Sequence, residues 1–238
     1  MASDLRRLDL RVSVPELGQR EGAVQLRPFV DGEDLLARGF PDEPGVDPGL
    51  LLVAGGPLEA GPVARTARLA ESECTQACCG ALDVTVRQVG DEVVWNDWRN
   101  TADDRITLPE LRFAAAQYHA ELARAVADHG WEWPARTVAR LLEERLRAEG
   151  ARAEGLRRED RWPDRWECEL RWVAAWHWEP ERVRVGFLDR RGSTADGLPR
   201  HRILLEFPVT AQEPADRARA LAERLLAGDP RELSSAGG

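Results

Sequence analysis

Arg165-Trp-Glu-Cys-Glu-Leu-Arg-Trp-Val-Ala-Ala-Trp-His-Trp178 is the stretch with the clearest structural signal in the chain. Every second residue is apolar or small, which is the period of a β-strand with one buried face. The residues of that face are Trp166, Cys168, Leu170, Trp172, Ala174, Trp176 and Trp178. We expect this tryptophan face to pack as core against helices. An aromatic recognition surface is the alternative, because tryptophan is enriched at binding hot spots.

The segments around this strand complete a mixed structure. Residues 183–187 and 202–209 predict two more strands, and residues 214–227 predict a helix with Ala218, Leu221, Ala222 and Leu225 on its buried side. Upstream, apolar residues recur at helical spacing over 109–128 and 134–150. We expect these two helices to form a helical hairpin.

The N-terminal half is rich in short strands. The sequence predicts a helical turn over 33–37 and an exposed loop over 39–49, where glycine and proline are frequent. It also predicts six strands, over 8–14, 24–30, 50–53, 64–70, 81–89 and 92–98. The fold class is therefore α+β, a mostly antiparallel sheet packed against the helical hairpin and the C-terminal helix. We expect an acidic β-rich half over 1–108 and a second half over 109–238, in one continuous domain.

Composition restricts the class of protein. The chain has 238 residues and a formal net charge of −9, and all of its basic residues are arginine. No segment approaches the roughly 20 apolar residues of a membrane span, and the four cysteines come without an export signal, which favours a cytoplasmic protein. Residues 1–108 hold 19 acidic and 11 basic side chains, and 109–238 hold 23 and 22. This distribution gives no electrostatic footprint for nucleic acid, and we expect neither a nucleic-acid nor a membrane partner.

The cysteine-rich loop over 74–80 is one candidate site. It carries Cys74, Cys78 and Cys79, and thiolates are zinc ligands. Side chains of adjacent residues in an extended segment point apart, and no second pair of ligands follows at a matching spacing. We therefore favour structural thiols and no cofactor. A zinc or thiol-redox site at these three cysteines, completed by Cys168 or a histidine, is the alternative.

A wider pattern surrounds this loop. Cys74 to Leu82, then Val84, Val86 and Glu92-Val-Val-Trp95, and later Phe113 and Tyr118, resemble a group of bacterial proteins without an established activity. In that group, a cysteine-rich loop precedes a strand hairpin that ends in Val-Trp. The resemblance covers at most residues 50–126. It departs from the group's pattern at Ser72 and Cys78, where a cysteine and a glycine would stand. If the group binds a metal at this loop, the departure implies that this chain has lost or rearranged the site.

Catalytic motifs do not point to an enzyme. The sequence has no nucleophile elbow, phosphate-binding lysine loop or His-Glu-x-x-His motif. Glu167 and Glu169 would lie about 7 Å apart on one strand face, a distance suited to acid and base work. Because Arg165 and Arg171 flank them, we favour ion pairs on a solvated face. An enzyme with a motif-free pocket is the least favoured alternative.

The acidic N-terminal half carries the favoured functional hypothesis. Complementary charge steers association, so a net charge of −8 over 1–108 favours binding of another, basic protein, as an inhibitor or immunity protein would do. The expected contact residues are Asp31, Glu33, Asp34, Asp42, Glu43, Asp47, Asp91, Glu92, Asp97, Asp103 and Asp104.

Overall fold

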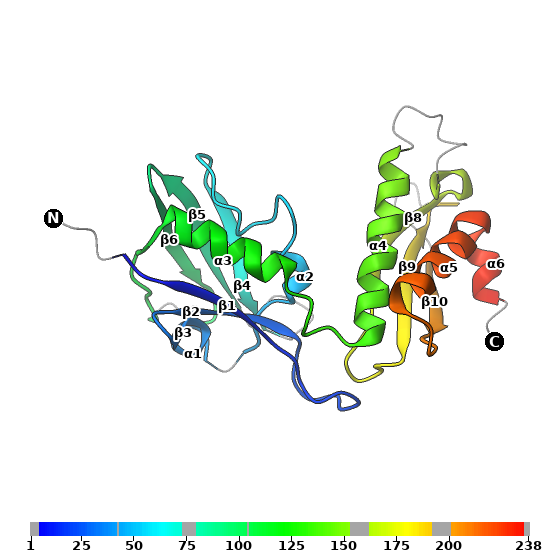
Figure 1. Cartoon of the computed structure of the whole chain (residues 1–238), viewed down its shortest axis with the longest axis horizontal. Helices are drawn as coiled ribbons and strands as arrows, with labels where there is room; N and C mark the ends of the chain where they lie inside the picture. Colours follow the sequence, from blue (N-terminus) through cyan, green and yellow to red (C-terminus); the bar gives the residue numbers. More distant parts are fainter. Residues whose placement is uncertain are drawn as a thin grey trace. The chain divides into compact units, whose positions relative to one another are not determined.

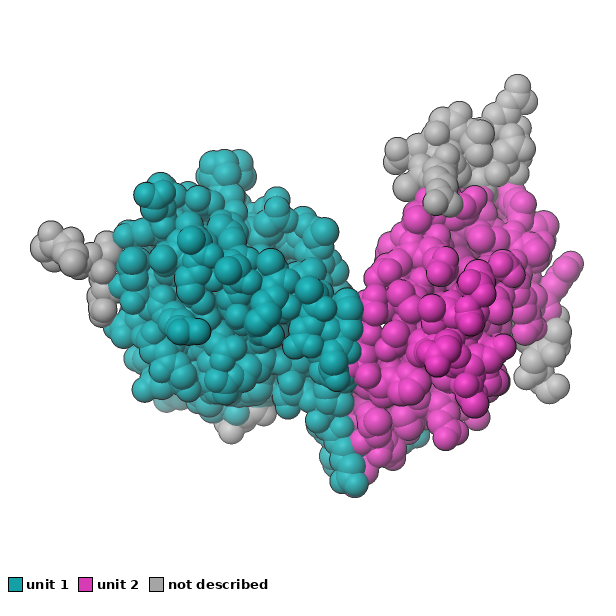
Figure 2. All heavy atoms as spheres, viewed as in Figure 1, with its two compact units in different colours: residues 1–16, 20–131 teal, residues 17–19, 132–238 magenta. Residues whose placement is uncertain are grey.

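The structure is a computed structural model that describes residues 5–41, 43–72, 80–103, 105–152, 162–191 and 201–235. It confirms the α+β class, with three antiparallel sheets and both long and short helices. The chain divides into two compact units, coloured in Figure 2. Unit 1 comprises residues 1–16 and 20–131, and unit 2 comprises residues 17–19 and 132–238.

The described residues of unit 1 form two antiparallel sheets and three helices; Figure 1 shows their arrangement. The first sheet has the order β1-β2-β3 and the second the order β4-β5-β6-β7. The bounds of these elements are β1 (Leu8–Ser13), β2 (Gln25–Val30), β3 (Glu33–Asp34), α1 (Leu35–Gly39), α2 (Pro48–Leu51), β4 (Arg65–Glu71), β5 (Ala81–Val89), β6 (Glu92–Asn100), β7 (Leu111–Ala114) and α3 (Ala115–Ala127).

Backbone hydrogen bonds join the two sheets of unit 1 at both ends. The Arg6 N–H donates to the Arg112 carbonyl at 2.7 Å, which links the start of β1 to β7. At the other end, Leu26 on β2 donates to the Val46 carbonyl, and Val46 donates to Leu69 on β4, each at 2.9 Å. These hydrogen bonds connect the two sheets around one apolar core.

The prediction that residues 39–49 form an exposed loop is wrong, because part of this segment is buried. Phe40 and Gly45 are buried, and Val46 fills the gap between β2 and β4 in the manner of a strand. The predicted strand over 50–53 is also wrong, because α2 begins at Pro48 and Asp47 caps it through the Gly49 N–H at 2.7 Å. Proline at the first helical position and aspartate before it are helix-start signals that outweigh the short apolar run.

Replacing Gly45 by alanine is expected to lower the free energy of unfolding by about 2 kcal/mol. A Cβ at this position would lie 2.5 Å from the Leu26 carbonyl oxygen, a backbone atom that cannot move without breaking the junction between β2 and β4. Urea unfolding measures the change. Gly61→Ala is the matched control, since a Cβ there meets no atom within 4 Å. Equal stability of the two variants would contradict the tight junction.

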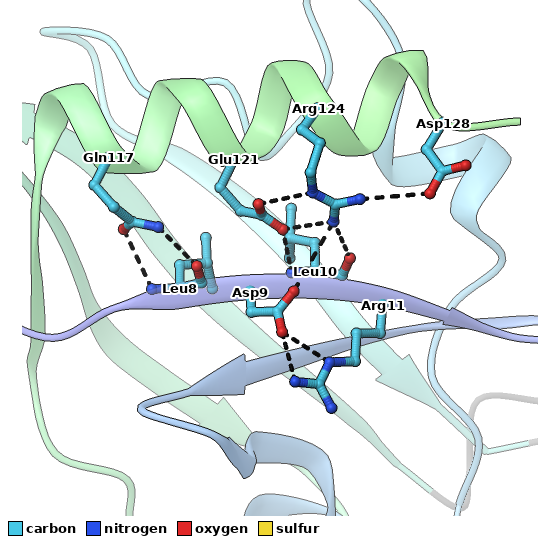
Figure 3. A network of polar contacts seen from close by, with 8 residues as sticks. All are labelled: Leu8, Asp9, Leu10, Arg11, Gln117, Glu121, Arg124 and Asp128. Atoms are coloured by element: carbon cyan, nitrogen blue, oxygen red, sulfur yellow. Dashed lines mark hydrogen bonds and ion pairs between the residues drawn. The ribbon is translucent and has the colours of Figure 1, made fainter.

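Helix α3 covers the outer edge of β1 (Figure 3). The Gln117 side chain accepts from the Leu8 N–H at 3.3 Å and donates to the Leu8 carbonyl at 2.7 Å. One turn later, Glu121 accepts from the Leu10 N–H and Arg124 donates to the Leu10 carbonyl, both at 2.6 Å. Four helical residues rise about 6 Å and two strand residues about 6.8 Å, so the periods match. Side chains thus replace a neighbouring strand and protect the edge at these two residues.

The predicted helix over 109–128 begins later than expected. Leu111 and Phe113 point into the core from β7, which pairs with β6, and α3 begins at Ala115. Pairing with an available sheet edge outweighs the helical spacing here. Helix α3 packs on β1 within unit 1, and the second helix of the predicted hairpin belongs to unit 2.

Unit 2 has an α-β-β-β-α order with a short final helix (Figure 1). Its strands are antiparallel in the order β10-β9-β8. The helices α4 and α5 pack on each other, and the buried residues Val185, Phe187 and Leu205 line one face of the sheet. The bounds are α4 (Pro134–Arg152), a 3₁₀ turn (Asp164–Trp166), β8 (Cys168–Ala174), β9 (Arg182–Asp189), β10 (His201–Pro208), α5 (Pro214–Ala227) and α6 (Pro230–Ser235). The four predicted residues on the buried side of α5 are confirmed.

A β-bulge in β8 divides the predicted tryptophan face between the two faces of the sheet. The register of β8 against β9 shifts between Leu170, which pairs with the buried Phe187, and Trp172, which pairs with Gly186. An extra residue in a strand reverses the alternation that follows it. Trp172 therefore lies on the face opposite to Leu170 and is 38% exposed. The prediction that Trp172 is core is wrong.

Candidate functional site

Two of the predicted contact acids are helix caps. Asp34 accepts from the N–H groups of Leu36 at 2.9 Å and Ala37 at 3.2 Å, and its other oxygen pairs with Arg27 at 2.6 Å. Asp47 caps α2 in the same way. A carboxylate bound to helix N–H groups has its lone pairs engaged. These two residues stabilise the local fold of unit 1.

Three further predicted acids are held by arginine. Asp31 accepts from the Arg7 N–H at 2.8 Å and pairs with Arg6 at 3.1 Å. The backbone hydrogen bond from Arg7 and the Arg6 side chain lower the pKa of Asp31.

Glu92 and Asp103 are the other two. Glu92 pairs with Arg112 at 2.8 Å, and Asp103 pairs with Arg105 at 2.8 Å. Hydrogen bonds from the Arg105 side chain and backbone lower the pKa of Asp103 to about 2. Asp103 is therefore ionised at neutral pH, and the adjacent arginines partly neutralise the charge of both carboxylates.

Four predicted acids have no ion pair with any residue in the described part of the chain. They are Glu33, Glu43, Asp91 and Asp97. Glu33, Asp91 and Asp97 are exposed, and Glu43 is half-buried. Asp42 and Asp104 lie outside the described residues. The expected surface therefore contains both structural and available carboxylates, a distinction that composition cannot make.

The negative charge of the chain belongs to unit 1. Within the bounds of the two units, unit 1 has 22 acidic and 13 basic side chains, and unit 2 has 20 of each. Arginines in unit 1 are shared: Arg112 pairs with Glu92 and Glu110, and Arg124 pairs with Glu121 and Asp128 (Figure 3). Each such cluster keeps an excess of carboxylate. The surface of unit 1 therefore attracts cations although most of its described acids are paired.

Asp97 lies in a β-bulge of β6. Thr85 pairs with Asn96, and Asp83 pairs with Arg99, so β6 has one residue more than β5 between these pairs. Asp97 takes the extra position with φ of 49°, in the left-handed region that non-glycine residues seldom adopt. Bulges redirect side chains and are frequent beside functional sites. Here the bulge places an exposed carboxylate beside a hollow in the surface.

This hollow has a volume of about 420 Å³ and is open to solvent. Two side chains anchor its wall, since the Trp98 indole N–H donates to the Pro109 carbonyl at 2.9 Å and the Asn100 amide donates to the Gly39 carbonyl at 2.8 Å. The lining combines two carboxylates, one guanidinium, two amides and an indole. Its residues are Asn96, Asp97, Trp98, Arg99, Asn100, Ile106, Thr107, Leu108 and Glu110.

Asp97 is the predicted contact acid that lines this hollow, and the other residues of the wall were missed. The polar run Asn96 to Asn100 directly after the apolar Val93, Val94 and Trp95 is the sequence signal that could have indicated them. The folding back of residues 105–110 against the strand leaves no such signal. It depends on contacts between distant residues, such as that of Trp98 with Pro109.

Cys74, Cys78 and Cys79 lie outside the described residues, and within the described ranges no cluster of histidine, cysteine and carboxylate side chains could hold a metal ion. Cys168 is buried in unit 2, where its Sγ lies 2.9 Å from Arg231 Nη1. Burial raises the pKa of this thiol, although Arg231 opposes the change. A raised pKa keeps the thiol protonated and unreactive at neutral pH.

Glu167 and Glu169, the predicted carboxylate pair, both lie beside arginine side chains. Glu167 precedes β8 with φ of 55° and lies 3.7 Å from Arg191. Glu169 pairs with Arg190 and, at 2.5 Å, with Arg171. The hydrogen bonds from Arg190 and Arg171 lower the pKa of Glu169, so this carboxyl cannot serve as an acid near neutral pH.

Comparisons with known proteins give no functional information about this site. The chain matches no family model, and no curated protein and no solved structure is significantly similar to it. The fold and surface define the class as an α+β protein with an acidic unit and a neutral unit. Within the described part of the chain, no helix has the length and apolar character needed to cross a membrane.

Proposed function

We propose that unit 1 binds a basic protein, in the manner of an inhibitor or immunity protein, with the hollow beside β6 at the centre of the contact. The observation that carries the proposal is Asp97. This carboxylate is exposed, has no ion partner among the described residues, and is held by a left-handed bulge beside the hollow. It belongs to the unit with the net negative charge.

The chemistry of the hollow suits an arginine side chain. A guanidinium binds carboxylates through two parallel hydrogen bonds and stacks on indole rings. Asp97 and Glu110 supply carboxylates and Trp98 supplies an indole, whereas Arg99 limits the net charge of the lining to −1. The lining offers hydrogen-bond acceptors and an aromatic surface, the combination found at binding hot spots.

The net negative charge of unit 1 should also affect the rate of association with a basic partner. A negative surface accelerates encounter with a positive partner, and the effect weakens as salt screens the charges over a Debye length of about 8 Å at physiological ionic strength. We therefore expect the association rate to fall steeply with salt, whereas the dissociation rate reports on the hollow itself.

Asp97→Asn is expected to weaken binding of a fluorescein-labelled arginine-rich peptide about three- to fivefold. Asparagine tolerates the left-handed region, so the bulge is kept and only the charge is lost. Fluorescence anisotropy at low and physiological salt measures the dissociation constant. Glu59→Gln is the matched control, because it removes one charge from an exposed position of unit 1 outside the hollow lining.

Two results would overturn the proposal. If the wild-type chain binds the arginine-rich peptide no better than a glutamate-rich peptide, unit 1 does not select basic partners. If Asp97→Asn and Glu59→Gln weaken binding equally, the net charge acts without the hollow, and the centre of the contact is not at β6.

A further inference from the structure

Strand β6 has an outer edge that β7 covers only in part. The two strands pair as far as Trp95, which lies opposite Leu111, the first residue of β7. Strand β6 continues to Asn100, and its inner edge pairs with β5 over this length. Among the described strands, none pairs with the outer edge of β6 over residues 96–100. This half of the edge is open.

Backbone hydrogen bonds at the two ends of β6 show which residues face the open edge. Before the strand, the Ala115 N–H donates to the Asp91 carbonyl at 2.8 Å, so Asp91 and every second residue after it point toward β7. After the strand, the Thr101 N–H donates to the Ala81 carbonyl at 2.9 Å, so the odd-numbered residues at this end point toward β5. The bulge at Asp97 causes this reversal.

The backbone N–H and C=O groups of Trp98 and Asn100 therefore point away from β5, toward the hollow that both residues line. These residues are two apart, which is the spacing at which a strand bonds to one neighbour. In another part of the lining, the N–H groups of Thr107 and Leu108 have no hydrogen-bond acceptor among the described residues. The hollow thus presents backbone groups suited to pair with an extended chain.

Unit 1 protects its other sheet edge in a different way. Along β1, side chains of α3 bond to the backbone at two residues. Along the open part of β6, no described side chain bonds to the backbone of Trp98 or Asn100. Their own side chains instead donate to the Pro109 and Gly39 carbonyls, which fixes the walls of the hollow and leaves the outward backbone groups uncovered.

The charges around this edge suit a basic segment. Asp97 is exposed and has no ion pair with a described residue, whereas Glu110 is engaged by Arg112 at 2.6 Å. Arg99 also lines the hollow and disfavours the entry of a second cation. Asp97 is therefore the carboxylate of the lining that is placed to bind one incoming arginine.

We infer that the basic partner of unit 1 supplies an extended segment that pairs as a strand with the outer edge of β6 and places an arginine on Asp97. This inference rests on the function proposed above and adds the binding mode. Added strands gain affinity from main-chain hydrogen bonds and specificity from side chains at alternate positions. Here Trp98 and Asn100 supply the main-chain groups, and Asp97 selects the basic side chain.

Backbone methylation of a peptide tests this pairing. The probe is the fluorescein-labelled peptide Thr-Val-Thr-Arg-Thr-Val-Thr, whose residues favour a strand. One variant carries N-methyl groups on the two threonines that flank the arginine, and the other carries them on the arginine and the second valine. Both variants keep the charge and lose two N–H groups, but on opposite edges of the strand.

Fluorescence anisotropy with the full chain gives the dissociation constants. One methylated variant should bind at least tenfold more weakly than the unmethylated probe, because its hydrogen bonds to β6 are lost, and the other should stay within threefold of the probe. A bulge that carries charge can also keep other strands off a sheet edge. In that case the unmethylated probe should not bind although the arginine-rich peptide does, and the inference would be overturned.

Amide hydrogen exchange of the full chain, followed by NMR with and without saturating unmethylated probe, locates the pairing. Exchange at Trp98 and Asn100 should slow at least tenfold, whereas Glu59, outside the lining, should keep its rate. Equal binding of the two methylated variants, or binding without slower exchange at Trp98 and Asn100, would overturn the inference and leave the proposed function in place. Failure of the arginine-rich peptide itself to bind would overturn both.

Discussion

Replacing Arg231 by alanine is expected to lower the free energy of unfolding of unit 2 by about 3 kcal/mol. The guanidinium of Arg231 links α6 to the start of β8, where it donates to the Trp166 carbonyl at 2.9 Å. It also pairs with Asp229 at 3.3 Å and Asp189 at 3.5 Å, and both carboxylates are buried. Removing the cation leaves two desolvated negative charges with reduced compensation, which costs more than the loss of a surface pair.

Urea unfolding followed by circular dichroism and tryptophan fluorescence measures this change. Arg219→Ala is the matched control, because Arg219 pairs with Asp216 on the surface of α5, where both side chains are more than half exposed. That variant should lose less than about 0.5 kcal/mol. A similar, small loss in both variants would show that Arg231 does not hold α6 in place.

Alkaline pH is expected to unfold unit 1 through Tyr118, the one tyrosine of the chain. Its hydroxyl donates to the Leu58 carbonyl at 2.7 Å and accepts from the Trp95 indole N–H at 3.2 Å, and the ring is fully buried. Burial raises the pKa of Tyr118 above its usual value of 10.0. The phenol therefore stays neutral in the folded state at a pH at which it ionises in the unfolded chain.

The sign of the effect follows from this difference. Because the folded pKa is raised, the stabilisation is complete below pH 10 and is lost as the pH rises toward the folded pKa. The expected loss is about 1.4 kcal/mol for each pH unit above about 10. Since the chain has no lysine, no lysine ammonium group contributes to the titration in this range.

Ultraviolet absorbance of the phenolate and circular dichroism, recorded on the same samples, measure this prediction. Phenolate should form only as the fold is lost, and the two transitions should coincide. Tyr118→Phe should remove this component of the alkaline loss, although it leaves the Leu58 carbonyl and the Trp95 N–H unpaired at a cost of about 2 kcal/mol at neutral pH. Phenolate formation near pH 10 in a chain that remains folded would contradict the buried position of Tyr118.

Local patterns in the sequence were sufficient for most elements. Alternation predicted β1, β2, β4, β5 and β9, and helical spacing predicted α4 and α5, because the buried residues of each element face the core of its own unit. Where the prediction failed, a distant partner decided the structure. Leu111 and Phe113 became a strand because the edge of β6 was free, and Val46 joined two strands that are far apart in the sequence.

The candidate sites show the same limit more strongly. Composition indicated an acidic N-terminal half, but it could not separate Asp34, a helix cap, from Asp97, an available carboxylate. The hollow beside β6 depends on a bulge of one residue, and the exposed face of Trp172 depends on another. A single extra residue leaves almost no trace in an alternating pattern, yet it reverses which side chains face the core.

The sequence by itself determined the α+β class, most of the strands and long helices, and the charge of each segment, because these follow from residue type and local period. The tertiary structure alone decided the connection of the two sheets in unit 1, the division into units after Trp131 and the roles of individual carboxylates. Those features depend on strand pairing and ion pairing between residues that are far apart in the sequence. The energy of such long-range contacts cannot be read from any short segment.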